Sequence, residues 1–378
     1  MRTRLASVLR QEWFLGFSWL TSLAFLLFGQ TLFAGLGDPL WLGVIFLWLF
    51  AAILGSSLAV VRHAEYLAAR LGEPLGTLLL TLSVTFIEVA SIAAVMLHGA
   101  NNPSLARDTL FAVVMIILNG MVGLSLLLGG WRHREQQYNL QGANAYLAVI
   151  VTLVVLTLIL PDFTQTTPGP YLSHEQEILL ALIGVGLYAT FLIMQTGRHR
   201  GFFSLANEHE EGAGSVVAAR RAQSVSRPRP VLSHAALLIA YLLPVVFLAE
   251  LFARPVDFLI ETLHAPVAIG GVIIAILVAT PEAIGAIRAA LANHLQRSVN
   301  IFLGSVLATI GLTVPAIIVV SRLTGLEIVL GVEHSDLVML SLTLFLCVVT
   351  FGSGRTNVIQ GAVHVVLFAV YLALIIQS

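Results

Sequence analysis

Apolar stretches long enough to cross a lipid bilayer dominate the sequence. A transmembrane helix requires about 20 mostly apolar residues, and eleven stretches approach or exceed that length. The pattern predicts an all-α integral membrane protein with about eleven transmembrane helices. We expect them near residues 13–35, 40–61, 75–97, 109–130, 143–161, 177–196, 232–253, 266–287, 299–320, 336–353 and 357–376.

The composition excludes most other classes of protein. Hydrophobic residues make up 58% of the 378 residues and charged residues 10%, whereas soluble domains average about 45–50% and 25%. A net charge of −1 gives no electrostatic reason to expect nucleic acid as a partner. The single cysteine, Cys347, cannot form an internal disulfide, and no CxxC or HExxH pattern suggests a zinc site or zinc protease.

The basic residues predict the orientation of the chain. All 19 are arginine, and with the N-terminus in the cytoplasm only Arg107, Arg254 and Arg322 fall on the outer side. Cytoplasmic loops carry an excess of basic residues, so we expect a cytoplasmic N-terminus and an external C-terminus. The first apolar stretch has a basic start, but it is too long for a signal peptide, and we interpret it as a retained helix.

One long polar segment, residues 197–231, divides the helices into six and five. It holds an acidic run, Glu208 to Glu211, and then a basic, proline-containing stretch. The simplest interpretation is a solvated cytoplasmic linker. The alternative is a cation or pH sensor formed by His209, Glu210 and Glu211, because histidine titrates near neutral pH.

The two halves resemble each other weakly but in the same order. The segment 64–71 recurs as 256–263, each followed three residues later by a proline and then by an apolar helix with one central glutamate. Helix 3 runs outward and helix 8 runs inward, so the copies are inverted. Inverted five-helix repeats are typical of transporters whose site lies at the repeat interface. We expect an N-terminal helix at 1–37, repeats at 38–196 and 232–378, and the linker at 197–231.

The central glutamates, Glu88 and Glu282, are the candidate functional residues. They occupy matching positions in the two repeats, whereas Glu250 lies near the outer end of helix 7. A charge in the middle of a bilayer is costly, so an ionisable residue there indicates function. One isolated glutamate is also compatible with a protonated or arginine-paired structural residue, but two at matching positions favour a site.

Oxygen-bearing groups surround the glutamates in the sequence. Thr81, Thr85 and Ser91 share the helix face of Glu88, and Pro281 frees the carbonyl of Leu277 by removing a backbone N–H. On helix 9, Ser305 and Thr309 fall on one face, and Asn119 on helix 4 corresponds to Thr309. Oxygen ligands suit hard cations such as Ca²⁺ or Na⁺, although the hydroxyl groups are equally compatible with helix packing.

Competition between ions suggests the mechanism. A carboxyl group buried in the membrane binds either a proton or a cation, and two of them balance one divalent ion. Mutually exclusive binding combined with alternating access produces antiport. We therefore expect no cofactor, and we expect Ca²⁺ or Na⁺ together with H⁺ to be the transported substrates; K⁺ is added only by the resemblance that follows.

Four stretches, at 60–88, 107–130, 279–315 and 353–374, resemble the cation/calcium exchanger superfamily, in its calcium/proton branch and most closely the bacterial ChaA-type antiporters. The resemblance implies an eleven-helix fold in the bacterial cytoplasmic (inner) membrane, with Glu88 and Glu282 forming the ion site between helices 3 and 8.

The sequence departs from the broader calcium/proton exchangers near both glutamates. Those exchangers carry the motif GNAxE, which ends on the glutamate. The corresponding residues here are VTFIE and VATPE, and Ala308 occupies the position of a glutamine in that pattern. ChaA-type members share such replacements and are associated with Na⁺ and K⁺ as well as Ca²⁺.

Other functions are less compatible with the sequence. A Na⁺/Ca²⁺-type exchanger without proton coupling stays open, but it would need further cation sites. A channel would not need paired titratable groups, and an enzyme would need a set of catalytic residues that the spans lack.

The histidines are interpreted separately. His63, beside Arg62, is a candidate pH-responsive gate or a plain interfacial residue. We interpret four others as packing or interfacial residues: His98, His234, His294 and His364. A homo-oligomer stays open.

Overall fold

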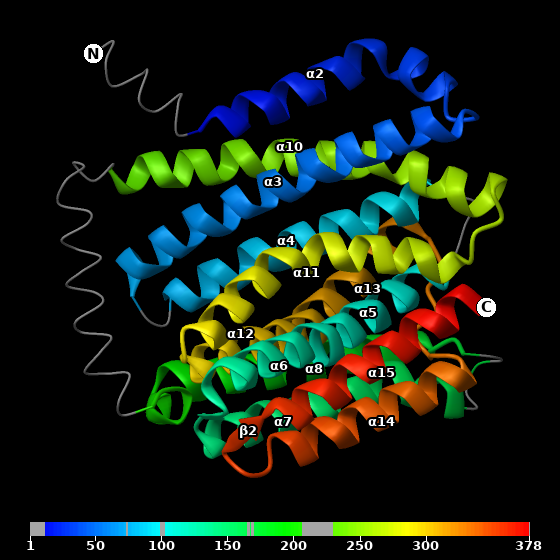
Figure 1. Cartoon of the computed structure of the whole chain (residues 1–378). Helices are drawn as coiled ribbons and strands as arrows, with labels where there is room; N and C mark the ends of the chain where they lie inside the picture. The colour runs from blue at the N-terminus through cyan, green and yellow to red at the C-terminus, as the bar shows by residue number, and fades with distance from the viewer. Residues whose placement is uncertain are drawn as a thin grey trace. The chain divides into compact units, whose positions relative to one another are not determined.

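The chain is almost entirely helical. The computed structural model describes residues 12–72, 75–98, 103–164, 167, 170–205 and 230–377 (Figure 1). In these residues ten helices are long and apolar enough to cross a membrane, and an eleventh, His334–Thr350, is shorter. The prediction of an all-α multi-pass membrane protein is confirmed.

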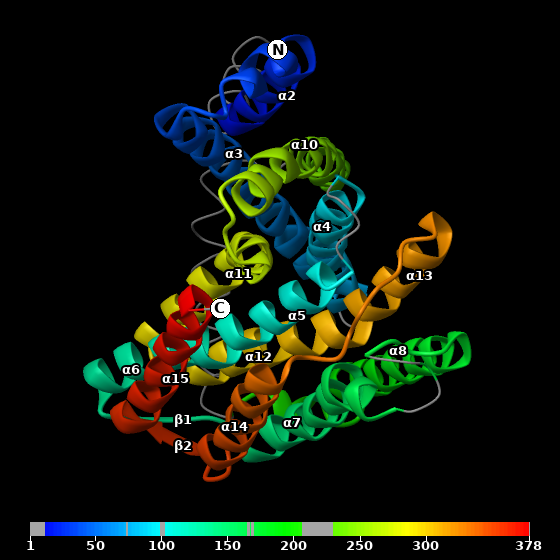
Figure 2. The same cartoon turned by 90° about the vertical axis from the view of Figure 1, so that its right-hand side faces the viewer.

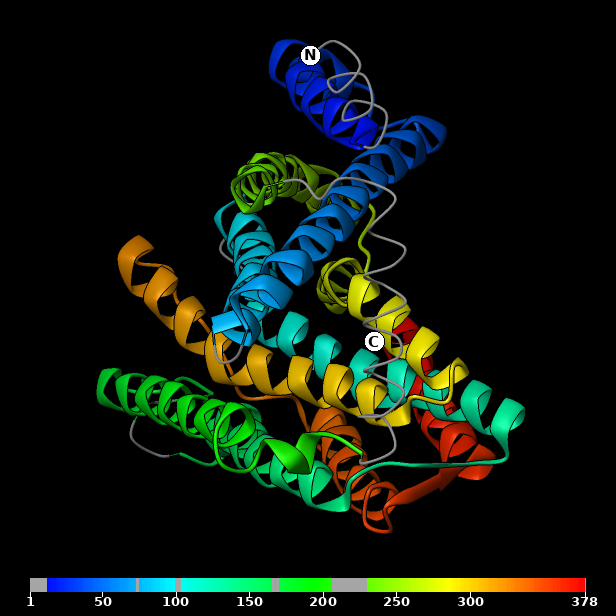
Figure 3. The ribbon, with the colours of Figure 1, turned by 90° about the vertical axis from the view of Figure 1, so that its left-hand side faces the viewer.

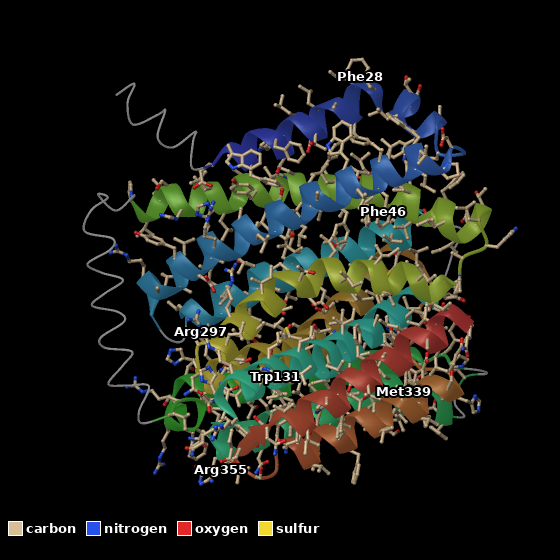
Figure 4. The ribbon with its side chains drawn as sticks, viewed as in Figure 1. Phe28, Phe46, Trp131, Arg297, Met339 and Arg355 are labelled. Carbon is tan, nitrogen blue, oxygen red and sulfur yellow. The ribbon has the colours of Figure 1, made fainter. Side chains whose placement is uncertain are left out.

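The helices form two compact units, residues 1–102 with 231–270 and residues 103–230 with 271–378. In the first unit, α10 packs against each of the other three long helices. Phe46 of α3 meets Phe252 of α10 with 5.0 Å between ring centroids (Figure 4). The helices of this unit are α2 (Trp13–Ala34), α3 (Pro39–Leu71), α4 (Leu75–His98) and α10 (Val231–Asp257), which continues into a π-helical turn, η5 (Phe258–Thr262).

The second unit contains the remaining helices, with α7 and α8 packed against the α12–α13 segment (Figure 3). Two of its long helices are interrupted midway by π-helical turns. Its elements are α5 (Leu105–Met115), η1 (Ile116–Met121), α6 (Val122–His133), α7 (Leu140–Val154), η2 (Val155–Ile159), η3 (Leu160–Phe163), α8 (His174–Thr196), η4 (Arg200–Phe203), most of α11 (Val267–Leu291), α12 (Leu295–Ala308), η6 (Thr309–Thr313), α13 (Val314–Thr324), α14 (His334–Thr350) and α15 (Val358–Gln377).

Several helices extend beyond the apolar stretches that predict them. The span expected at 40–61 continues to Leu71 in α3, and the span expected at 232–253 continues through η5 to Thr262. Polar side chains such as Arg62 and Glu65 are exposed on the extension of α3. Hydropathy measures the membrane crossing, whereas the backbone hydrogen bonds of a helix continue past it.

A short antiparallel ribbon joins two loops of the second unit, which the sequence did not predict. Strands β1 (Glu135–Gln137) and β2 (Arg355–Asn357) pair with Gln136 opposite Thr356 (Figure 2). The side chain of Gln136 donates to the carbonyl of Ala290 at 2.8 Å. The ribbon therefore ties the α6–α7 and α14–α15 connections to the end of α11.

In the second unit, the loop after α13 bonds to the residue Pro103 before α5 and to the turn η2 at the end of the α7 span. The amide of Val329 donates to the carbonyl of Pro103 at 2.9 Å, and that of Val332 donates to Leu158 at 2.9 Å. These two bonds fasten the loop after α13 to other parts of the second unit.

Glycine allows α6 and α15 to approach closely. A Cβ atom on Gly361 of α15 would lie 2.3 Å from the backbone nitrogen of Leu127, and one on Gly123 of α6 would lie 2.8 Å from that of Val365. Membrane helices lack a hydrophobic drive to associate and depend on close packing of small residues. These two glycines therefore set the distance between α6 and α15.

We predict that Gly361→Ala destabilises the folded protein, because the added methyl group meets backbone that cannot move aside. Overpacking of this kind costs about 1–3 kcal/mol. The measurement is the midpoint of thermal aggregation in detergent, followed by size-exclusion chromatography. Gly186→Ala is the control, since nothing lies within 4 Å of a Cβ atom there; equal midpoints for the two variants would contradict the prediction.

Candidate functional site

A hydrogen bond joins Glu282 of α11 to Ser305 of α12. The hydroxyl of Ser305 donates to Oε2 of Glu282, and both side chains are partly buried. A short connection around Asn293 joins the two helices, and the hydroxyl of Ser298 donates to the carbonyl of Ala286 at 2.9 Å. These two bonds set the register of α11 and α12, which places the hydroxyl of Ser305 beside the carboxylate of Glu282.

The helix that carries Glu282 contains a proline one residue earlier. Helix α11 is continuous from Val267 to Leu291, with Pro281 inside it and buried. Proline has no N–H to donate to the carbonyl four residues before it, which belongs to the buried Leu277. The carbonyl oxygen of Leu277 therefore lacks its usual helical hydrogen bond, and it lies about one turn before the carboxylate of Glu282.

The second carboxylate lies in the first unit, on α4. Glu88 is only 2% exposed, and Thr85 and Ser91 on the same helix are also buried, whereas Thr81 is partly buried. The hydroxyl of Ser91 donates to the carbonyl of Ile87 at 2.8 Å, within its own helix. Burial of a carboxyl group and neighbouring hydroxyls in an apolar helix is the feature expected of an intramembrane ion site.

The π-helical turns contain the two residues that the repeat aligns. Asn119 lies in η1 and Thr309 is the first residue of η6, and both are buried. A π-helical turn shifts the hydrogen-bond pattern of a helix by one residue and is frequent at functional sites. The sequence analysis did not predict these turns, although Pro315, just after η6, has no N–H to donate to the carbonyl of Gly311 within the turn.

Asn119 belongs to a buried polar network on α14 and α15. Its Nδ2 donates to Oγ1 of Thr343 at 2.8 Å, and its Oδ1 accepts from Nδ1 of His364 at 3.3 Å. Nε2 of His364 lies 3.0 Å from Oγ1 of Thr350. The sequence interpretation of His364 as a packing residue missed this network, although an ionisable residue within an apolar stretch is itself a signal.

The candidate gate residues fall in two groups. His63 is buried in the first unit, beside Glu12 and His234. His209, Glu210 and Glu211 lie outside the described residues, so their sensing role stays a prediction.

Comparison with known proteins supplies the family. The sodium/calcium exchanger protein family matches residues 41–197 and 233–377. The chain belongs to this family. The y4hA protein of Sinorhizobium fredii, whose name places it among ionic transporters, is 46% identical to this exchanger over 88% of each chain. The sodium-potassium/proton antiporter ChaA of Escherichia coli is 41% identical over 85% of each chain.

A solved structure has the same fold as this exchanger. The Ca²⁺/H⁺ antiporter protein YfkE superposes with a TM-score of 0.71 at 17% identity, covering 97% of this chain and 98% of that one. At this level of identity the superposition establishes the arrangement of helices and not the substrate.

We predict that Thr343→Val destabilises the exchanger by about 1–3 kcal/mol, the cost of leaving a buried amide without its acceptor. The measurement is again the thermal midpoint in detergent. Thr152→Val is the matched control, because Thr152 is exposed and bonds only to its own helix. Equal losses in both variants would show that the network does not stabilise η1.

Proposed function

We propose that the exchanger is a secondary cation/proton antiporter that exports Ca²⁺, Na⁺ or K⁺ in exchange for H⁺. The observation that carries the proposal is the hydrogen bond from Ser305 to Glu282 in the middle of an apolar helix. It places a hydroxyl beside a carboxylate at a position where a bilayer disfavours the isolated charge. The names of the relatives support proton exchange, since ChaA is named for sodium, potassium and protons and YfkE for calcium and protons.

We propose that Glu88 and Glu282 act as one cation and proton site between inverted repeats at 38–196 and 232–378. The helix bounds support this proposal, because α4 has 24 residues and α11 has 25, each preceded by a long helix and followed by one with a π-helical turn. The two segments matched by the family nearly coincide with the two repeats. Thr81, Thr85, Ser91, Asn119 and Thr309 are proposed as accessory polar groups.

The mechanism follows from the environment of the carboxylates. The bilayer disfavours an isolated charge, so each glutamate is neutralised by a proton or by a bound cation. A cation that enters therefore displaces protons, and the empty site must be protonated before it reorients. The carbonyl of Leu277 and the hydroxyl of Ser305 supply neutral oxygens, which suit Ca²⁺, Na⁺ and K⁺ alike.

The proposed location is the bacterial cytoplasmic membrane, with the N-terminus inside and the C-terminus outside. The bacterial relatives and the arginine distribution support it. The bilayer, the cations and protons are the proposed partners, and we propose no resident cofactor. The number of copies in the assembly stays open.

The decisive experiment uses proteoliposomes with a pH dye inside and an imposed proton gradient. Addition of Ca²⁺, Na⁺ or K⁺ should collapse the gradient, and the ranking of the three gives the selectivity. Cation exchange against Na⁺ with no proton movement would favour the Na⁺/Ca²⁺-type alternative instead.

We predict that Glu88→Gln and Glu282→Gln each abolish proton-coupled transport, because an amide cannot bind and release a proton. Both variants should reach normal amounts in the membrane. Glu250→Gln is the control, since Glu250 is exposed on α10, and it should transport normally. Substantial transport by either of the first two variants would reject the two-carboxylate site.

We predict that Ser305→Ala raises the cation concentration for half-maximal transport by about tenfold or more. A hydrogen bond to a charged group is worth about 1.5–3 kcal/mol, and about 1.4 kcal/mol is a factor of ten. Ser305→Thr keeps the hydroxyl and should restore most of the affinity. If alanine and threonine behave alike, Ser305 does not act on Glu282.

A further inference from the structure

A pocket lies where α6 ends and α15 begins, in the second unit. It has a volume of about 460 Å³ and is open to the outside. This volume falls within the range of small-molecule sites, about 300–1,000 Å³. We call it the α6–α15 pocket; its lining residues come from both helices and from the turns beside them and are Gly130, Trp131, Arg134, Asn357, Val358 and Ile359.

The α6–α15 pocket lies at the level where two membrane spans end. The candidate span Leu105–His133 ends two residues after Trp131, and the candidate span Val358–Gln377 begins one residue before Ile359. Tryptophan is enriched at this level in membrane proteins, where its ring meets the lipid headgroups. Trp131 is 81% exposed, as expected of such an interfacial residue (Figure 4). The pocket therefore opens at the level of phospholipid headgroups.

Two backbone features shape the pocket. Gly130 lets the ends of the two helices meet, because a Cβ atom there would lie 2.8 Å from the backbone nitrogen of Val358. The chain then leaves α6 at Arg134, whose φ is +67° and whose amide donates to the carbonyl of Gly130 at 2.7 Å. A residue with a side chain is uncommon at positive φ, where glycine is favoured. An arginine thus lines the pocket at a turn whose backbone favours glycine.

Positive charge predominates around the pocket. Arg134 lines it, Arg132 stands two residues earlier, and Arg355 lies on the same face of β2 as the lining residue Asn357; all three arginines are exposed. The adjoining segments 130–142, 284–300 and 351–360 contain five arginines and one acidic residue, Glu135. Glu135 lies 3.6 Å from Arg355. The pocket therefore suits an anion.

Two stripes of exposed apolar side chains begin at the pocket and follow α6 and α15. Residues spaced by three and four positions lie on one face of a helix. The stripes consist of Leu124, Leu128 and Trp131 on α6, and of Ile359, Val363 and Val366 on α15. Because α6 ends and α15 begins at the pocket, both stripes run from it toward the middle of their spans. A ligand with a charged head and apolar chains matches this layout.

We infer that the α6–α15 pocket binds an anionic phospholipid, with its phosphate beside Arg134 and its acyl chains along the two apolar stripes. Guanidinium groups bind phosphate through paired, charge-assisted hydrogen bonds, and basic pockets between membrane helices bind anionic headgroups. A zwitterionic lipid offers the same chains without a net charge, so the arginines favour an anionic one. The bound lipid bridges the ends of α6 and α15 and stabilises this part of the second unit.

The test measures lipid binding by native mass spectrometry of the full-length protein in a neutral detergent. The probes are dioleoyl phosphatidylglycerol, which is anionic, and dioleoyl phosphatidylcholine, which has the same chains and no net charge. The wild type should bind phosphatidylglycerol at least about tenfold more tightly. Arg132→Gln combined with Arg134→Gln should remove most of this preference, since each arginine near a headgroup contributes about fivefold.

Arg198→Gln combined with Arg200→Gln is the matched control. These two arginines are exposed at η4, and the double substitution removes the same charge outside the pocket. The control should keep the preference of the wild type. Equal binding of the two lipids by the wild type, or an equal loss of preference in the two double variants, would overturn the site.

Thermal stability gives a second measurement on the same variants. A ligand that binds only the folded state stabilises it, so phosphatidylglycerol should raise the thermal midpoint of the wild type and the control but not that of the pocket variant. If the pocket variant does not fold, Trp131→Ala replaces it, because it removes part of an apolar stripe and no charge. Trp131→Ala should weaken binding of both lipids at least about threefold; unchanged binding would overturn the placement of the lipid.

Two other occupants of the pocket are distinguished by the same preparation. Inorganic phosphate, compared with chloride at equal ionic strength, should not displace phosphatidylglycerol, since it makes no contact with the apolar stripes. Displacement would identify a soluble anion and overturn the lipid. A dimer in size-exclusion chromatography that the pocket variant dissociates, without any lipid preference, would identify a second copy of the chain instead. All these measurements read binding or stability, so they decide the lipid site independently of proton-coupled transport.

Discussion

The lack of water inside a bilayer is the constraint on which the rest of this structure depends. Every backbone N–H and C=O in the membrane needs a partner within the protein, and a helix provides one for each residue. This requirement accounts for the long helices and for the absence of sheet within the described spans. The two short strands, β1 and β2, lie in connections between helices and outside the described spans.

Departures from regular helix are informative because the membrane makes them costly. Pro281 removes a donor one residue before Glu282, and the π-helical turns η1 and η6 contain Asn119 and Thr309. The chain thus places its irregular backbone on the same helices as its intramembrane polar groups. Such a correspondence is expected when freed backbone oxygens and side-chain oxygens serve the same ion.

Packing between the helices relies on different physics from a water-soluble core. Helix α6 and helix α15 approach through Gly123 and Gly361, where dispersion replaces the hydrophobic effect. Buried hydrogen bonds such as those of Asn119 then fix which helices are neighbours. The bonds that Glu12 accepts from Arg62 of α3 and Tyr241 of α10 do the same within the first unit.

The sequence by itself determined the all-α membrane class and the family resemblance, and it predicted the matching glutamates, because hydropathy and isolated charges are properties of single helices. It did not reveal the β1–β2 ribbon, the partners of His364, or the meeting of His63 with Glu12 and His234. Each of these includes a contact between residues more than a hundred positions apart. Only the tertiary structure decided them, since hydrogen-bond partners across helices are chosen by packing and not by the periodicity of any one segment.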